Sequence, residues 1–195
     1  MNHMKKILFY VLALALMVSP ALAAHKHKEK GAEAEAADPT DSSDSYWYLG
    51  VGPLLSLPVQ DINTFYGSGI GGTAYVGYQV NKDVALELDL DNVSYSASNG
   101  LSDYELRAMP TVKYFLGGKD LQPYLLGGLG LDLQFASASG ISASGTSIEE
   151  NLGVGCKLKL AHRTYVFLEV KYDFIFSSGV TGEDLPIIAG LEFGL

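Results

Sequence analysis

The chain has little of what most site chemistries require. It contains one cysteine, Cys156, so it cannot form an internal disulfide. Lysine and arginine number 13 against 22 acidic residues, and the net charge of −9 argues against nucleic acid as a partner. After residue 23, no apolar run reaches the roughly 18 residues of a membrane-spanning helix, which argues against a helical multispan protein. The 22 glycines and 12 tyrosines are instead typical of a β-rich fold with tight turns.

The first 23 residues have the pattern of a secretory signal peptide. Two lysines precede an apolar run over residues 7–18, and small residues occupy both key positions of a cleavage site after Ala23. Residues 24–45 are rich in Ala, Glu and Asp and contain no aromatic residue, so we predict a disordered acidic tail. His25 and His27 lie in this tail without a further ligand nearby, and we predict no metal site and no cofactor.

From Tyr46 onward the sequence repeats one two-faced design. Around Val166, apolar side chains such as Leu168 occupy the even-numbered positions, whereas Glu169 and Lys171 occupy odd-numbered positions. Alternate side chains of an extended chain point to opposite faces, so this pattern predicts a strand with one apolar and one polar face. The eight predicted strands are Tyr46–Leu55, Gly69–Val80, Asp83–Asn92, Tyr104–Leu116, Gln122–Phe135, Ile148–Leu160, Arg163–Phe176 and Pro186–Leu195.

The connections between these strands alternate in length. Three are short turns, and four are longer polar loops at residues 56–68, 93–103, 136–147 and 177–185. In an antiparallel meander, alternate connections lie at the same end, which is the arrangement of outer-membrane barrels with short periplasmic turns and long outer loops. We therefore predict that residues 46–195 form an all-β, eight-stranded antiparallel up-and-down transmembrane β-barrel, with the N-terminal tail in the periplasm.

Alternation alone does not say which face is outside, because a secreted lipocalin-like carrier alternates as well, with its apolar face inward. Glycine on the polar face favours lipid outside, since glycine makes room for larger side chains within a narrow barrel and serves a solvated surface poorly. Aromatic residues near the strand ends predict two membrane-interface belts. They are Trp47, Tyr48, Tyr78, Tyr114, Tyr165 and Phe193 at the turn end, and Tyr95, Tyr104, Phe135, Phe174 and Phe176 at the loop end.

Charged residues on the polar face then form the candidate site inside the barrel. Buried ions persist only when they are paired, so the set predicts a structural network of salt bridges, with a narrow ion path as the alternative. The third and fourth strands should bring Asp89 and Asp91 opposite Arg107. The predicted network is Glu87, Asp89, Asp91, Arg107, Lys113, Lys157, Lys159, Glu169, Lys171 and Asp173.

Three segments carry a family resemblance: YVGYQVNKDVALELDL, LKLAHRTYVFLEVKYDF and the closing DLPIIAGLEFGL. With the leader, they resemble the small outer-membrane β-barrels, the opacity-type surface antigens and their OmpA/OmpX-like relatives, over about residues 46–195. The resemblance implies a place in the outer membrane and insertion by the outer-membrane assembly machinery. It also implies a role as adhesin, envelope stabiliser or surface protein.

Catalysis is not predicted. Outer-membrane barrels that act on lipid or peptide usually need a histidine base at the outer rim. The four histidines fall in the leader, the tail and a predicted periplasmic turn: His3, His25, His27 and His162. We interpret Asp103, Glu183 and Asp184 as solvated acids in the predicted loops. We predict a monomeric integral outer-membrane protein, not an enzyme, with a structural or adhesin-like role and any surface ligand bound by the four loops. A narrow pore and a lipocalin-like carrier are the alternatives.

Overall fold

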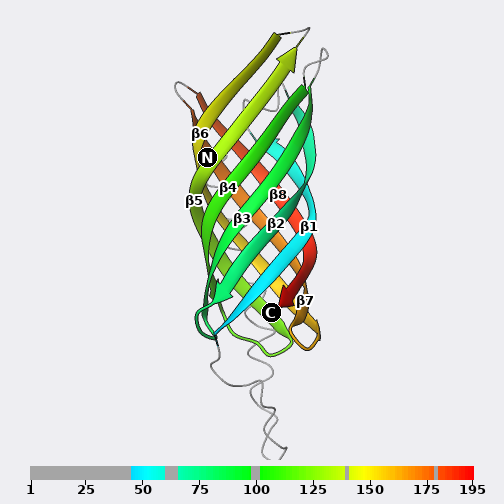
Figure 1. The fold of residues 1–195 in the computed structure, drawn as a ribbon, viewed down its shortest axis with the longest axis vertical. Coiled ribbons are helices and arrows are strands. Elements are labelled where there is room, and N and C mark those ends of the chain that lie inside the picture. The colour runs from blue at the N-terminus through cyan, green and yellow to red at the C-terminus, as the bar shows by residue number, and fades with distance from the viewer. Residues whose placement is uncertain (1–44, 60–65, 98–101, 139–140, 178–179) are drawn as a thin grey trace, which may run out of the picture. The chain divides into compact units, whose positions relative to one another are not determined.

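The chain folds into eight strands that close on themselves. The structure, a computed structural model, describes residues 45–59, 66–97, 102–138, 141–177 and 180–195. Each strand pairs antiparallel with the next, and the first also pairs with the last, which closes the barrel (Figure 1). This confirms the predicted eight-stranded antiparallel up-and-down architecture. The strands are β1 (Tyr46–Val59), β2 (Tyr66–Gln79), β3 (Val84–Ala97), β4 (Ser102–Phe115), β5 (Leu121–Ala138), β6 (Ile141–Ala161), β7 (Thr164–Ser177) and β8 (Val180–Gly194).

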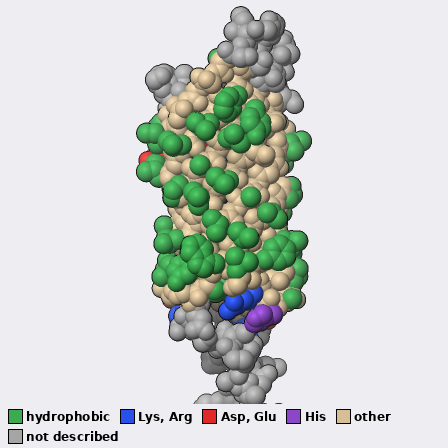
Figure 2. Space-filling view, viewed as in Figure 1, with side chains coloured by type: hydrophobic (Ala, Val, Ile, Leu, Met, Phe, Trp, Pro, Cys, Tyr) green, Lys and Arg blue, Asp and Glu red, His purple; other side chains and the backbone are tan. Residues whose placement is uncertain are grey.

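The period-two pattern places the apolar side chains outside and the charged ones inside. Leu86 and Leu131 are about half exposed on the outer wall, whereas Glu87 and Lys171 are buried. Hydrophobic side chains are spread over the visible wall, with basic and histidine side chains near one end of it (Figure 2). A lipocalin-like carrier needs the opposite orientation, so this arrangement excludes that alternative. Within the described ranges, no helix is long and apolar enough to cross a bilayer.

The strands are longer than the sequence predicted at the loop end. They continue through most of the four segments predicted as loops, and the remaining residues, 60–65, 98–101, 139–140 and 178–179, lie outside the described part of the chain. The apolar alternation fades in these segments because neither face of a strand needs to be apolar beyond the hydrocarbon. Backbone pairing continues without that pattern, so the prediction of long loops was wrong.

One hairpin extends farther than the others. β5 has 18 residues and β6 has 21, compared with 14 in β7 and 15 in β8. β5 and β6 pair up to Ala138 and Ile141, but the pairing of β6 with β7 begins only at Ile148. Residues 141–147 of β6 are therefore paired on one side alone among the described residues. Figure 1 shows this hairpin rising above the neighbouring strands.

Inward-facing tyrosines fit against glycines on the neighbouring strands. Tyr48 lies opposite Gly77, and a Cβ added at Gly77 would stand only 2.2 Å from Cζ of Tyr48. The same fit joins Tyr75 to Gly50 and Tyr124 to Gly155, each a cross-strand pair. Glycine on the polar face thus makes room for large rings in the lumen. Three aromatics that the sequence assigned to the interface belts, Tyr48, Tyr95 and Tyr165, are buried, so that assignment was wrong for them.

Candidate functional site

The lumen holds most of the charged residues that the sequence selected. Nine of the ten are buried on the inner face. The tenth, Lys159, lies half-buried near the turn end and forms no ion pair within the described ranges. Arg107 stands directly opposite Asp91 across β3 and β4, as expected, but Asp89 stands opposite Met109. The buried nine are Glu87, Asp89, Asp91, Arg107, Lys113, Lys157, Glu169, Lys171 and Asp173.

Two lysines occupy the turn-end half of the lumen. The Lys113 ammonium lies 2.9 Å from a Glu87 carboxylate oxygen and 2.5 Å from one of Glu169. It also lies 4.7 Å from the centre of the Tyr75 ring, within the range of a cation–π contact. Lys157 pairs with Glu192 at 2.9 Å. Each ammonium group therefore has at least one carboxylate partner in a space with little access to water.

A third lysine lies about halfway along the lumen. Lys171 of β7 contacts Asp89 at 2.9 Å, and Asp91 and Glu169 lie at 3.8 and 3.9 Å from its ammonium nitrogen. The Thr111 hydroxyl donates a hydrogen bond to the same Asp89 oxygen, at 3.0 Å. These contacts link β3 to β7 across the barrel, because the two strands are not neighbours in the sheet.

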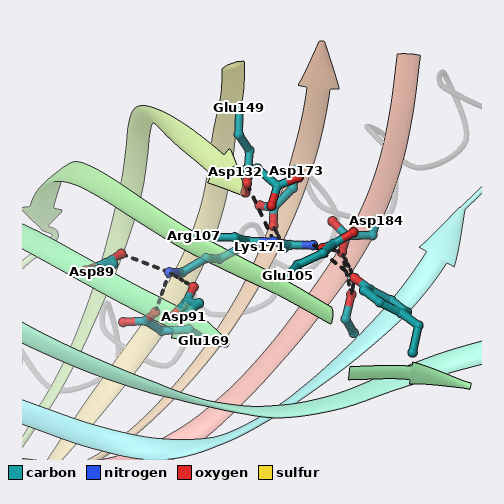
Figure 3. Close-up of polar contacts among 12 residues, drawn as sticks. Asp89, Asp91, Glu105, Arg107, Asp132, Glu149, Glu169, Lys171, Asp173 and Asp184 are labelled. Atoms are coloured by element: carbon teal, nitrogen blue, oxygen red, sulfur yellow. Dashed lines mark hydrogen bonds and ion pairs between the residues drawn. The ribbon is translucent and has the colours of Figure 1, made fainter. Parts of the chain in front are cut away.

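Arg107 is the centre of the loop-end half. Its guanidinium lies 2.8 Å from Asp173 and 2.7 Å from Asp184, and it also pairs with Glu105 and, at 3.6 Å, with Glu149. Figure 3 shows these carboxylates around the guanidinium, with Asp132 beside them. The Arg107 cluster is defined here as Glu105, Arg107, Asp132, Glu149, Asp173 and Asp184, and all six side chains are buried.

Hydroxyl groups complete the partners of Asp184. The Tyr95 hydroxyl donates to an oxygen of Asp184 at 2.7 Å, and the Ser56 hydroxyl donates to the same oxygen. Arg107 in turn donates to the Tyr95 oxygen at 2.9 Å. These bonds join β1, β3, β4 and β8 through one carboxylate. The interpretation of Asp184 as a solvated loop acid was therefore wrong, because β8 begins at Val180 and carries Asp184 into the lumen.

Sequence reasoning missed six buried acids: Asp103, Glu105, Asp132, Glu149, Asp184 and Glu192. Four of them lie on predicted strands or at their edges and on the polar parity, so alternation alone could have selected them. Asp103 and Asp184 could not be found in this way while their segments were interpreted as loops. β4 begins at Ser102 and Asp103 is buried, so the interpretation of Asp103 as a solvated loop acid was wrong as well. The missed residues make the lumen far more acidic than the selected set implied.

The arrangement suits holding the barrel closed. Within the described part of the chain, no group of three or more His, Cys, Asp and Glu side chains is spaced to hold a metal ion. The one histidine in that part, His162, is exposed at the turn end. What the charges do instead is cross-link strands: Arg107 and Lys113 of β4 reach β7, and Lys157 of β6 reaches β8.

The comparisons agree with this architecture. A family model described as an outer membrane protein beta-barrel domain matches residues 9–193. The structure of Neisserial surface protein A (NspA) covers 78% of this chain and 99% of its own, at 16% identity and a TM-score of 0.61. The N-terminal β-barrel domain of Pseudomonas aeruginosa OprF covers 77% and 100%, at 17% identity and a TM-score of 0.51. Ail, the attachment invasion locus protein of Yersinia pestis, covers 78% and 100%, at 15% identity and a TM-score of 0.52.

At these identities the structural likenesses bear on the fold alone. No curated protein matches the sequence. The family model, however, spans nearly the whole chain, and the closed barrel, apolar outer wall and charged lumen agree with it. The chain belongs to the outer membrane protein β-barrel family.

Proposed function

We propose that this outer-membrane barrel has a non-enzymatic, structural and surface-interacting role, and that it binds its partner through the β5–β6 hairpin. The observation that carries the proposal is the extension of this hairpin beyond the pairing of β6 with β7. Removal of residues 1–23, a periplasmic tail at 24–45, insertion by the outer-membrane assembly machinery and a monomeric state belong to the same proposal.

The free edge of the hairpin gives it a means of binding. Residues 141–147 pair with β5 on one side, and the backbone groups on their other side have no strand partner among the described residues. Such an edge can accept an extended segment of another protein through main-chain hydrogen bonds. The small side chains Ala143, Ser144 and Thr146 are exposed there and leave the backbone open to a partner.

The charge of the loop end limits the chemistry of that partner. The segments 56–68, 93–103, 136–147 and 177–185 contain no lysine or arginine. A structure of Ail is described in complex with the heparin analogue sucrose octasulfate. A polyanion of that kind needs basic side chains, which this loop end does not offer. We therefore infer a partner that is neutral or basic, with an exposed extended segment.

Shortening the hairpin tests the proposal. Residues 136–143 would be replaced by Asn-Gly, which closes the hairpin after Phe135 and before Ser144, a cross-strand pair, with a favoured two-residue turn. Cells that display the full barrel should adhere to host-cell or matrix-protein surfaces, and cells with the shortened hairpin should lose that adhesion. Heat-modifiable gel migration must show both barrels folded. Equal adhesion by both would refute binding through the hairpin.

The pore alternative rests on the polar lumen and is tested separately. In planar bilayers, we expect no ohmic openings, because Arg107, Lys113, Lys157 and Lys171 are held across the lumen by carboxylates. Openings that change when Lys171 is replaced by Met would support conduction and overturn the closed-lumen part of the proposal. Protein-free bilayers are the control: openings that are equally frequent there are artefacts.

A further inference from the structure

The positive charges of the barrel are divided between the lumen and the turn end. Residues 46–195 contain eight lysines and arginines, and none of them lies in the four segments at the loop end. Four are buried in the lumen, and each of these is ion-paired with a carboxylate. The other four, called here the turn-end cations, are Lys82, Lys119, Lys159 and Arg163.

Each of the three short turns carries one of these cations. Lys82 lies between β2 and β3, Lys119 between β4 and β5, and Arg163 between β6 and β7. Since the turns follow one another around the closed sheet, their cations are spread around the rim and are not gathered on one side. Figure 2 shows basic and histidine side chains at this end of the visible face, directly next to hydrophobic side chains of the wall.

The turn-end cations, unlike those of the lumen, form no ion pair with a carboxylate within the described ranges. The side chains of Lys82 and Lys119 are exposed. Only two acids, Asp83 and Asp120, lie among the described residues of the turns, against four cations, so this end keeps an excess of positive charge. That charge is available to an anion outside the chain.

Arg163 is partly engaged within the protein. Its guanidinium donates a hydrogen bond to the main-chain oxygen of Leu195 at 2.9 Å and lies 5.1 Å from the centre of the Tyr46 ring. These contacts hold the guanidinium beside the ends of β1 and β8. An arginine that is positioned in this way retains donors for a phosphate group.

An aromatic belt places the turn-end cations close to lipid headgroups. Trp47 and Tyr114 are exposed on the outer wall at this end, and the ring centres of Trp47 and Tyr78 lie 5.0 Å apart. Such belts lie at the level of the headgroups. Tyr78 and Tyr114 shortly precede Lys82 and Lys119 in the chain. A lysine stem can lie along the apolar wall while its ammonium group stays in the polar layer, so these lysines can reach the phosphates.

We propose that the turn-end cations bind the phosphate groups of anionic phospholipids in the membrane leaflet at that end. A layer of headgroups surrounds the barrel and therefore matches cations that are spread around its rim, whereas a single protein partner would contact one side. Each basic residue at an anionic membrane surface strengthens binding about fivefold. The loop end has no lysine or arginine and offers no such contact, so the preference for anionic lipid belongs to one end of the barrel.

Trp47 can report which lipid lies beside this rim. It pairs with Tyr78 on the strand that leads into the turn of Lys82, and its carbonyl oxygen accepts a hydrogen bond from Leu195, which also contacts Arg163. Bromine on a lipid acyl chain quenches tryptophan fluorescence only at short range. The folded protein would be placed in vesicles of equal parts phosphatidylglycerol and phosphatidylcholine, with bromine on one lipid or on the other.

We expect brominated phosphatidylglycerol to quench Trp47 more strongly, by an amount that corresponds to a preference of about fivefold or more. Lys82→Gln should reduce this preference about fivefold, and Lys82→Arg, which keeps the charge, should retain it. Lys119→Gln is the matched control, because it removes the same charge at the same end from a turn nearly opposite Trp47 in the strand order. It should leave quenching as in the wild type. Added salt at about 1 M should weaken the preference.

Two results would overturn the proposal. Equal quenching by the two brominated lipids in the wild type would mean that the turn end does not select anionic headgroups. If Lys82→Gln has no effect, or if Lys119→Gln reduces the preference as much, no phosphate is bound at the rim beside Lys82. Heat-modifiable migration confirms that each variant is folded before the vesicles are compared. Neither result depends on adhesion through the β5–β6 hairpin, so the two proposals fail separately.

Discussion

Replacing Gly77 with alanine should destabilise the barrel because Tyr48 fills the space that the new methyl group would need. That methyl would lie 2.2 Å from Cζ and 2.6 Å from the hydroxyl oxygen of Tyr48, whereas carbon atoms in contact are usually about 3.5–4.0 Å apart. The ring is fully buried, and its hydroxyl donates to Glu87 at 2.7 Å, so it cannot move without losing that bond. Overpacking of this kind costs roughly 1–3 kcal/mol.

Gly72→Ala on the same strand is the matched control. A methyl there meets only ordinary contacts, the nearest being the Gly52 carbonyl oxygen at 3.5 Å. Its main effect is on the unfolded chain, which should stabilise the fold by about 0.4–1 kcal/mol. The two alanine variants should therefore differ by roughly 1.5–4 kcal/mol in free energy of unfolding.

Equilibrium urea unfolding in lipid vesicles measures this difference, with the fluorescence of Trp47, the chain's single tryptophan, as the signal. Trp47 lies on the outer wall, so its emission should change when it leaves the lipid. If Gly77→Ala proved as stable as Gly72→Ala, the account of inward glycines as space for tyrosine rings would be refuted.

Two further predictions test the lumen and the outer wall. Arg107→Met leaves the Arg107 cluster without its positive charge and should lower the free energy of unfolding by roughly 3–5 kcal/mol. The control, Lys119→Met at an exposed turn, should change it by no more than about 0.5 kcal/mol. Equal effects of the two variants in the urea assay would contradict the buried network. Cys156 shares the outward parity of Leu158, so in intact vesicles it should react with an apolar maleimide and resist a charged, membrane-impermeant one. A cysteine placed by Lys82→Cys in a Cys156→Ser background should react with the charged reagent, and rapid reaction of Cys156 with it would contradict a lipid-facing position.

The barrel, and which face of its wall points outward, could be predicted from the sequence because they depend on local rules. Alternation along Arg163–Phe176 separates Leu168 from Glu169 by geometry alone, and such a pattern repeated eight times requires a closed two-faced sheet. Because the short turns follow alternate strands, the sequence also indicated that all of them lie at one end of the barrel. These features need no knowledge of contacts between distant strands.

What the tertiary structure decided is which charges meet and how far the strands run. Arg107 of β4 reaches Asp173 of β7 and Asp184 of β8 across the lumen, and sequence separation gives no measure of that distance. Those contacts depend on how the closed sheet staggers its strands, which alternation does not encode. The length of the β5–β6 hairpin was hidden for a different reason. Beyond the bilayer both faces of a strand can be polar, so the backbone ladder continues after the side-chain pattern that reveals it has ended.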